Sequence, residues 1–194
     1  MTETLIIDEF HEFGGKHCET ASSKKLLNLH ELSISEEMLL GSGSGVGFIY
    51  WYMRKMPSTF IGTRYSNSEN FLLTICKRLG ARPTVTETSS PKKGCAELKA
   101  TLKTGEPAIC YGDLAYPPYF ALPEIVHFGG HAFVVFGLDE KRGEVYISDR
   151  HPNLSKHLLK TCRKQEVHDS HLSLQSTSCS KLNTHKKLHT SKKA

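Results

Sequence analysis

Apolar side chains recur at three- and four-residue intervals in several stretches between residues 18 and 105. This spacing predicts amphipathic helices at about residues 18–30, 35–41, 68–79 and 91–104. Ser35 precedes two glutamates, which is typical of a helix start, and Pro91 is a favoured first-turn residue. Glycines at positions 41, 80 and 105 are expected to end three of these helices.

Shorter apolar runs follow the fourth predicted helix. Residues 107–111 form one such run, which indicates a buried strand. Two more runs, Ala132–Leu138 and Glu144–Ser148, are separated by five mostly charged residues that end in glycine, and this predicts a β-hairpin. A short strand is expected around Val85, and residues 5–13 are expected to be extended or irregular. This order indicates an α+β fold, with N-terminal helices packed on a C-terminal antiparallel sheet.

The apolar pattern stops after Arg150. Residues 151–194 are rich in Ser, Thr, Lys and His and contain no Phe, Trp or Tyr. They hold 9 Lys and Arg against 2 Asp and Glu, whereas residues 1–150 hold 16 against 18, a net charge of −2. We therefore expect one folded domain at residues 1–150 and a basic, disordered tail at 151–194. Because the basic charge belongs to the tail, the domain gives no reason to expect nucleic-acid binding.

No apolar run approaches the roughly 20 residues that a membrane-spanning helix needs, and the first ten residues do not resemble a secretory signal. The six cysteines have no paired C-x-x-C spacing, so we expect neither a disulfide framework nor a structural zinc site. These features favour a cytoplasmic protein with reduced thiols and no membrane contact. A reduced thiol is available as a nucleophile.

Cys18 is the first candidate for that role, because it opens the first long predicted helix. Unpaired backbone N–H groups and the helix dipole stabilise a thiolate at such a position. Lys16 and His17 beside it act in the same direction. An inert, buried cysteine is the alternative interpretation, and we adopt that alternative for Cys76, Cys95 and Cys110, which lie inside apolar or amphipathic patterns.

A cysteine nucleophile needs a base that a third group orients. His131 follows two glycines and opens the strand whose remaining residues are almost wholly apolar. If Leu138 pairs with Glu144, Asp149 falls opposite Phe133 and diagonally adjacent to His131, with backbones roughly 7–8 Å apart. A slip of one residue would put Asp149 on the other face. A structural histidine is the alternative, but the order Cys, His, Asp is that of papain-type enzymes, so these residues predict a catalytic triad.

Other groups of residues give weaker evidence for a functional site. The repeat Gly43–Gly47 follows a predicted helix instead of a strand and is not followed by Lys-Ser or Lys-Thr, so a pocket-lining loop is favoured over a phosphate cradle. The cysteines and histidines of the tail match no zinc-finger spacing, and we expect no metal and no cofactor. The aromatic residues Trp51, Tyr52 and 116–120 are expected in the core or in a pocket wall.

Several motifs of the chain together resemble those of one known family. They are Gly15-Lys16-His17-Cys18-Glu19-Thr20-Ala21-Ser22, Ile34-Ser35-Glu36-Glu37-Met38-Leu39-Leu40-Gly41, Gly47-Phe48-Ile49-Tyr50, Phe128-Gly129-Gly130-His131-Ala132-Phe133-Val134-Val135-Phe136-Gly137 and Val145-Tyr146-Ile147-Ser148-Asp149-Arg150. On these motifs the chain resembles the N-terminal domain of butirosin biosynthesis protein H over about residues 10–150. The late Gly-His-x-x-Val-Val run also looks like that of bacteriocin-processing cysteine peptidases.

The resemblance implies a papain-like fold and an acyltransferase that moves an aminoacyl chain from a carrier-protein thioester to an aminoglycoside amine, as in antibiotic biosynthesis. Cys18 would receive the acyl group from the phosphopantetheine thiol, His131 would act as the base, and Asp149 would hold its ring. The implied partners are an acyl carrier protein and a small-molecule amine acceptor. Candidates for the oxyanion hole or pocket are His11, Glu12, His17, Gly47, Tyr50, Tyr111 and Tyr119.

Two departures from the family pattern bear on activity. Papain-like enzymes usually carry an oxyanion-hole Gln about six residues before the cysteine, where this chain has Glu12, and an ionised carboxylate cannot donate a hydrogen bond. Family members continue into a second domain, and here the basic tail stands in its place, which suggests a truncated or frame-shifted chain. The alternatives to acyl transfer are therefore a cysteine peptidase or amidase, and an inactive remnant that serves at most as a binding module.

Overall fold

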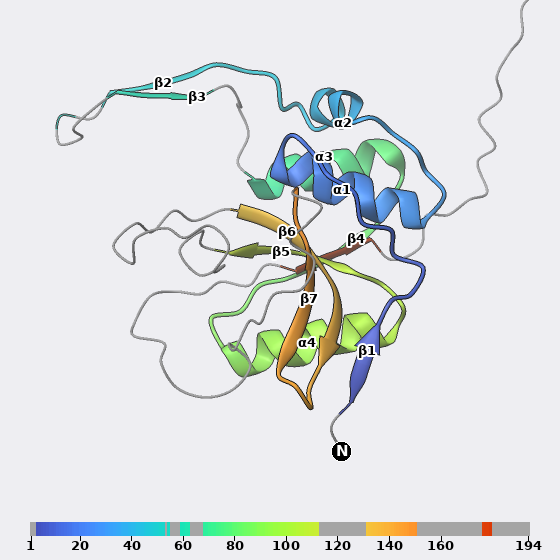
Figure 1. The fold of residues 1–194 in the computed structure, drawn as a ribbon. Coiled ribbons are helices and arrows are strands. Elements are labelled where there is room, and N and C mark those ends of the chain that lie inside the picture. Colours follow the sequence, from blue (N-terminus) through green and yellow to red (C-terminus); the bar gives the residue numbers. More distant parts are fainter. Residues whose placement is uncertain are drawn as a thin grey trace, which may run out of the picture.

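The computed structural model describes residues 3–52, 54, 59–62, 68–112, 131–150 and 176–179. Its centre is a six-stranded sheet in the order β1-β6-β5-β8-β4, with β7 paired to β6 (Figure 1). All pairs in this sheet are antiparallel. The strands are β1 (Thr4–Ile6), β4 (Pro83–Thr86), β5 (Ala108–Gly112), β6 (His131–Asp139), β7 (Glu144–Ser148) and β8 (Ser176–Cys179).

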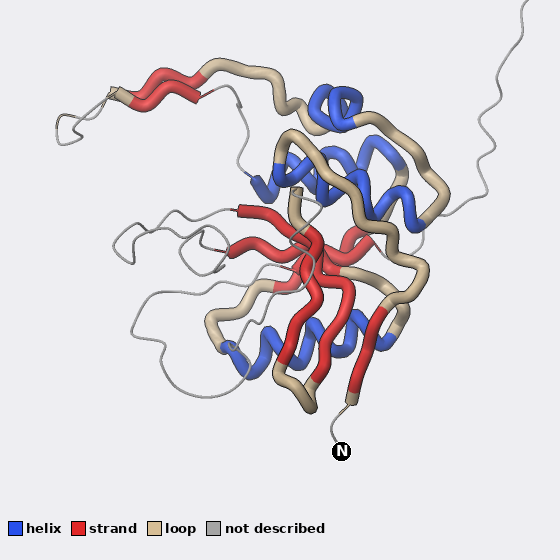
Figure 2. Tube along the Cα trace, in the orientation of Figure 1, coloured by secondary structure: helices blue, strands red, loops and turns tan. Residues whose placement is uncertain are grey.

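Four helices cover this sheet, and with it they confirm the expected α+β fold. The helices are α1 (Cys18–Leu29), α2 (Glu36–Ser42), α3 (Ser68–Leu79) and α4 (Pro91–Lys103). Figure 2 shows α1, α2 and α3 gathered on one side of the sheet and α4 on the other. The core between these layers is apolar and includes Leu26, Phe71, Ile75, Val134 and Ile147, all at most 2% exposed. Burying such side chains is the main stabilising term of the fold.

The helix ends largely follow the sequence signals. The Ser35 hydroxyl accepts the N–H of Met38 at 3.2 Å, as expected of the residue that caps α2. Gly80 and Gly105 have positive φ, a conformation that favours glycine, just after α3 and α4. One predicted end is wrong: α2 continues through Gly41 to Ser42.

The β6–β7 hairpin differs near its turn from the expected register. Asp139 pairs with Glu144, where the sequence pattern predicts Leu138. A β-bulge then lies between Val135 and Gly137 and adds one residue to β6 that has no counterpart on β7. The register therefore shifts by one residue between the turn end and the far end of the hairpin.

Beyond the bulge the register is the expected one. Val134 pairs with Ser148, so the next positions, Phe133 and Asp149, come opposite each other. His131 lies two residues before Phe133 and thus on the same face of the sheet. Without the bulge, the pairing at the turn would carry Asp149 to the other face. This one-residue irregularity therefore places Asp149 and His131 on a common face.

A second, two-stranded sheet lies apart from the main one. It consists of β2 (Ile49–Trp51) and β3 (Phe60–Gly62), and it extends away from the helices in Figure 1. We call it the aromatic ribbon. Trp51 is 59% exposed and Tyr52 is 70% exposed, so the expectation that they lie in the core or in a pocket wall is wrong.

The expected tail touches the main sheet at one place. Ser176–Cys179 form β8, which pairs with β4 and β5, whereas the sequence pattern predicts disorder. Residues 151–175 and 180–194 lie outside the described part of the chain, as do residues 113–130, so the domain boundary stays a prediction. Cys95 on α4 is disulfide-bonded, which the cysteine spacing did not predict, while Cys18, Cys76 and Cys110 are in the thiol form.

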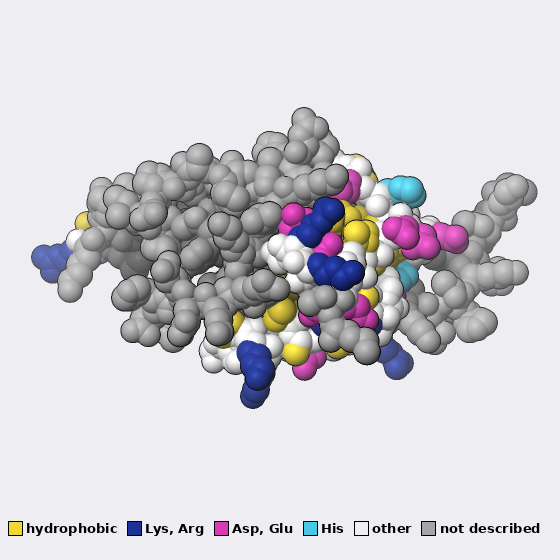
Figure 3. All heavy atoms as spheres, turned by 60° about the horizontal axis from the view of Figure 1, so that its bottom comes forward, with side chains coloured by type: hydrophobic (Ala, Val, Ile, Leu, Met, Phe, Trp, Pro, Cys, Tyr) yellow, Lys and Arg dark blue, Asp and Glu magenta, His cyan; other side chains and the backbone are white. Residues whose placement is uncertain are grey.

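Charges on the described surface are mixed. On the face shown in Figure 3, acidic and basic side chains lie interspersed. One example is Lys99 of α4, which lies 3.2 Å from Glu3 and 2.8 Å from Glu140. Among the described residues, no helix is long and apolar enough to cross a membrane.

Candidate active site

Cys18 is the first residue of α1, at the end of a loop that a neighbouring helix holds in place. The carboxylate of Glu36, at the start of α2, accepts the backbone N–H groups of Lys16 at 3.1 Å and His17 at 3.2 Å. It also accepts the hydroxyl of Thr20 at 2.8 Å. Glu36 thus satisfies donors that a helix start leaves without intrahelical partners, and it does so from another element. The thiol of Cys18 lies half-buried beside this capped loop.

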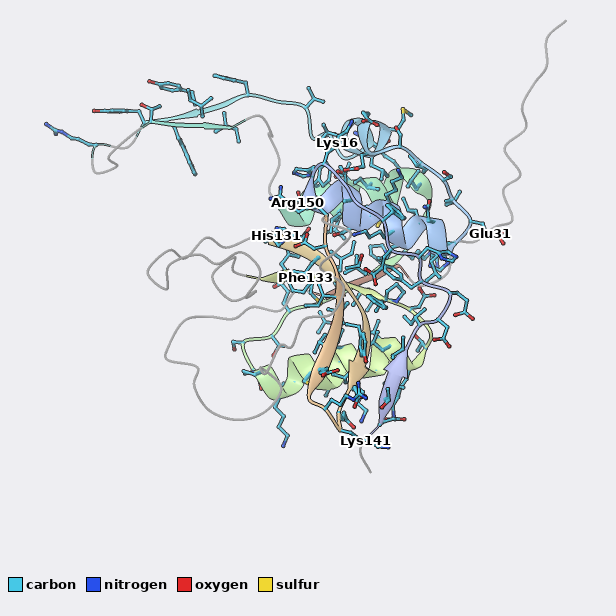
Figure 4. All side chains as sticks on the ribbon, viewed as in Figure 1. Lys16, Glu31, His131, Phe133, Lys141 and Arg150 are labelled. Carbon is cyan, nitrogen blue, oxygen red and sulfur yellow. The ribbon has the colours of Figure 1, made fainter. Side chains whose placement is uncertain are left out.

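The same loop is tied to the end of the β6–β7 hairpin. The N–H of Gly15 donates to the carbonyl oxygen of Arg150 at 2.8 Å. A Cβ atom at Gly15 would overlap the side chain of Ala21, so only glycine fits here without a shift. Figure 4 shows Lys16, Arg150 and His131 close along one side of the molecule, where α1 begins and β6 starts.

His131 and Asp149 form a buried pair, in agreement with the predicted register. The Nε2 atom of His131 lies 2.7 Å from Oδ2 of Asp149, and both side chains are at most 5% exposed. The second carboxylate oxygen of Asp149 accepts the N–H of Arg150 at 2.6 Å. The imidazole also hydrogen-bonds the thiol of Cys18. Because Nε2 is bonded to Asp149, Nδ1 is the ring nitrogen left for the thiol.

The protonation of His131 follows from these contacts. Burial alone would lower the pKa of its imidazole, since it disfavours the charged form. The hydrogen bonds to Asp149 and Cys18 outweigh burial and raise the pKa from 6.5 to about 9. The ring is therefore protonated at neutral pH. A protonated imidazole next to a thiol favours the thiolate, which is the nucleophilic form of cysteine.

Two of the pocket candidates lie beside the nucleophile. Tyr111 on β5 is buried, and its hydroxyl donates to Oε1 of Glu19 at 3.0 Å. Glu19 directly follows Cys18 and is fully buried. His17 precedes Cys18, and its Nε2 atom lies 3.9 Å from Oε2 of Glu19. The structure thus gathers His17, Cys18, Glu19 and Tyr111 at the start of α1.

The other candidates come from segments outside the start of α1, and of these the charge of Glu12 reaches Lys25 of α1. His11 and Glu12 are exposed in the segment that follows β1. Gly47 lies in the segment that leads to the aromatic ribbon, and Tyr50 is 61% exposed on the ribbon itself, which extends away from α1 and β6 (Figure 1). Tyr119 lies outside the described residues. Among the described residues, no cluster of His, Cys, Asp and Glu is suited to hold a metal ion.

Sequence reasoning missed two charged residues near the triad. Lys25 on α1 is only 2% exposed, and its ammonium donates to the carbonyl oxygen of Asp149 at 2.5 Å. A lysine seven residues after Cys18 shares its helix face, and that spacing was the available signal. The sequence pattern places Glu36 in the first turn of its own helix. No local pattern shows that its carboxylate also accepts hydrogen bonds from the loop before α1.

Comparisons with known proteins show the family and the fold of this chain. The family model for butirosin biosynthesis protein H, N-terminal, matches residues 17–150. The chain belongs to this family. Its match begins one residue before Cys18 and includes the hairpin with His131, and Asp149. No curated protein matches the chain.

Among solved structures, the chain is similar to a protein from Bacillus anthracis described as a C39-like peptidase. The TM-score is 0.62 and the sequence identity is 17%, and the alignment covers 92% of this chain and 98% of that chain. At this identity the likeness shows the fold, which confirms the expected papain-like arrangement. The chain is thus a member of the butirosin biosynthesis protein H, N-terminal, family with a papain-like fold.

Proposed function

We propose that this chain is a cysteine-dependent acyltransferase in which Cys18 is the nucleophile, His131 the base and Asp149 the residue that orients the base. The observation that carries the proposal is the continuous hydrogen-bonded series from the Cys18 thiol to His131 and on to Asp149. Such a series activates a thiol, because the base takes its proton and the carboxylate fixes the ring. Membership of the butirosin biosynthesis protein H family supports a biosynthetic transfer over degradation.

In the first half-reaction the donor is an acyl thioester. The Cys18 thiolate attacks the thioester carbonyl, and the new bond joins Sγ to the acyl carbon. The bond between that carbon and the donor sulfur then breaks, and the departing thiol takes the proton from the His131 imidazolium. We propose the backbone N–H of Cys18, at the start of α1, as a donor to the oxyanion that forms in between.

In the second half-reaction an amine is the acceptor. Its nitrogen attacks the acyl carbon on Cys18, an amide bond forms, and the bond to Sγ breaks. The proton lost by the amine passes to His131, which restores the thiolate and imidazolium. Asp149 stabilises the imidazolium in both stages, because its carboxylate lies 2.7 Å from the ring. We propose a phosphopantetheine thioester on an acyl carrier protein as the donor and a small-molecule amine as the acceptor.

The test uses the full chain and a defined thioester. The protein is incubated with an aminoacyl pantetheine thioester, and intact mass spectrometry then measures the adduct. We expect one acyl group on Cys18, none in Cys18→Ala, and its loss when an amine such as an aminoglycoside is added. Cys110→Ala is the matched control, because Cys110 is a free but buried thiol and its removal leaves the adduct in place.

Two other outcomes would contradict the proposal. Cleavage of a peptide panel by the wild type, without any thioester adduct, assigns the site to a peptidase or amidase. Inertness in both assays, although Cys18 still reacts with iodoacetamide, assigns the chain to a non-catalytic binding module.

A further inference from the structure

Lys25 is a deeply buried cation near the proposed triad, and the mechanism above does not use it. It lies on α1 and is only 2% exposed. Its ammonium donates to the main-chain oxygen of Asp149 at 2.5 Å. Burying an ammonium costs several kcal/mol unless it is well paired. A lysine held there therefore calls for a reason beyond packing.

The surroundings of Lys25 compensate its charge only in part. Burial lowers the pKa of its ammonium from 10.5 to about 8, although the negative charges of Asp149, Glu12 and Glu36 oppose this effect. The ring of Phe13 lies 5.8 Å from the Lys25 nitrogen and 5.3 Å from that of Lys24, the next lysine on the helix. At neutral pH Lys25 is thus a cation beside the residue that orients the base.

The position of Lys25 on α1 links the two halves of the site. It follows Cys18 by seven residues, which is about two helical turns, or about 10 Å along the axis. One helix therefore carries the nucleophile at its first residue and, two turns later, the lysine that hydrogen-bonds the main chain of Asp149. Asp149 in turn sets the ring of His131. The helix fixes the spacing between the thiol and the orienting carboxylate.

We propose that Lys25 is a positioning residue, which holds the main chain of Asp149 so that its carboxylate stays aligned with His131 and His131 with Cys18. This role rests on the proposed function of the triad. Lys25 does not touch the reacting atoms and acts through Asp149. The loss of its ammonium frees the Asp149 main chain, loosens the bond to His131 and leaves Cys18 with a less effective base.

The experiment compares Lys25→Met with Lys24→Met in the full chain. Methionine has a similar length, and the substitution removes a buried charge at the cost of one hydrogen bond to the Asp149 carbonyl, so we expect the variant to fold. The measurements are the NMR titration midpoint of the His131 ring and the rate of Cys18 alkylation by iodoacetamide at pH 7. For Lys25→Met we expect a midpoint at least about one pH unit lower, which corresponds to a tenfold change in the proton affinity of the ring. We also expect a clearly slower alkylation.

Lys24→Met is the matched control, because it loses the neighbouring contact with Phe13 but no contact with Asp149. It should leave both readouts at their wild-type values. Lys25→Gln, which keeps a neutral donor, should lie between the wild type and Lys25→Met. If Lys25 acted only through its charge, its removal would raise the midpoint, because a nearby cation disfavours the imidazolium, so a downward shift separates positioning from simple charge loss.

The proposal is overturned if Lys25→Met folds with the wild-type midpoint and alkylation rate. It is also overturned if neither Lys25 variant folds, since Lys25 would then be a determinant of folding. Neither readout needs an acyl substrate, so failure of the thioester assay in the wild type would count against the acyltransferase alone.

Discussion

The two sides of the proposed site are built by different means. On the nucleophile side, a short loop before α1 is held by polar contacts from other elements, above all the carboxylate of Glu36. On the base side, His131 and Asp149 belong to a hairpin whose strands are largely buried and whose alignment is set by main-chain pairing. The base side is therefore part of the core, whereas the nucleophile side depends on a few charges. We expect single substitutions on the two sides to differ in their effects on reaction rate and on stability.

The largest effect should come from breaking the base side at its carboxylate. Asp149→Asn keeps the shape but removes the charge that holds the imidazolium of His131. We expect acyl-adduct formation on Cys18 to slow by about 10²- to 10⁴-fold. The control is Asp139→Asn at the turn end of the same hairpin, where Asp139 accepts the N–H groups of Lys141 and Arg142. An equal loss of rate in both variants would show that only hairpin stability matters.

The next effect concerns the close contact between the main chain of Gly15 and the side chain of Ala21, on the nucleophile side. Gly15→Ala places a Cβ against Ala21 and near Glu36, so the loop before Cys18 must shift. We expect the free energy of unfolding to fall by about 1–3 kcal/mol, together with a slower alkylation of Cys18. Gly41→Ala is the control, since nothing lies within 4 Å of its added Cβ and alanine favours a helix. Equal unfolding curves for Gly15→Ala and the wild type would contradict the contact.

A smaller effect tests the hydrogen bonds that the carboxylate of Glu36 accepts from the start of α1 and the loop before it. Glu36→Gln weakens charge-assisted hydrogen bonds from Lys16, His17 and Thr20 and should lower the free energy of unfolding by about 1 kcal/mol. Glu37→Gln keeps the shape and weakens an exposed ion pair with Lys16 and exposed hydrogen bonds at the start of α2, which water screens, so it should change urea unfolding less than Glu36→Gln. If Glu37→Gln were the more damaging substitution, the cap would not hold the loop.

A separate effect is the contribution of the buried pair to stability across the pH range. The pKa of His131 is raised to about 9 in the folded chain, above its ordinary value of 6.5. Its ion pair with Asp149 therefore stabilises the fold fully below pH 6.5, and this contribution is lost as the pH rises through about 9. Urea unfolding at several pH values should show this loss in the wild type and a flatter profile in Asp149→Asn. Parallel profiles would mean that the two residues are not coupled.

The sequence predicted the helices and the hairpin well, because both rest on local patterns. The spacing of apolar residues located α3 at Ser68–Leu79 without error, and glycine marked its end. The pairing at the turn was wrong by one residue, since a bulge leaves no clear trace in the alternation of a strand that is buried throughout. The expected facing of His131 and Asp149 nevertheless agrees with the structure, because the bulge offsets the error.

Contacts between distant elements were harder to predict. The aromatic run that forms the ribbon has the composition of a buried strand, yet Trp51 and Tyr52 are exposed, since burial depends on what packs nearby and not on composition alone. The hydrogen bond from Lys25 to the carbonyl oxygen of Asp149 joins residues 124 positions apart. A lysine is expected at the surface by default, so only the folded arrangement identifies this one as buried.

The bond between Gly15 and Arg150 has a consequence for how any acyl-enzyme assay is read. It fixes the starting point of residues 151–175 beside the nucleophile loop, and β8 fixes their other end in the main sheet. The first lysine of that segment, Lys156, follows Arg150 by six residues, a span of at most about 20 Å. A lysine joined to the site by so short a stretch of chain would compete with an added amine at an effective concentration of about millimolar order. Peptide mapping should therefore accompany the intact-mass assay, so that transfer to a lysine of the chain is distinguished from transfer to an added amine.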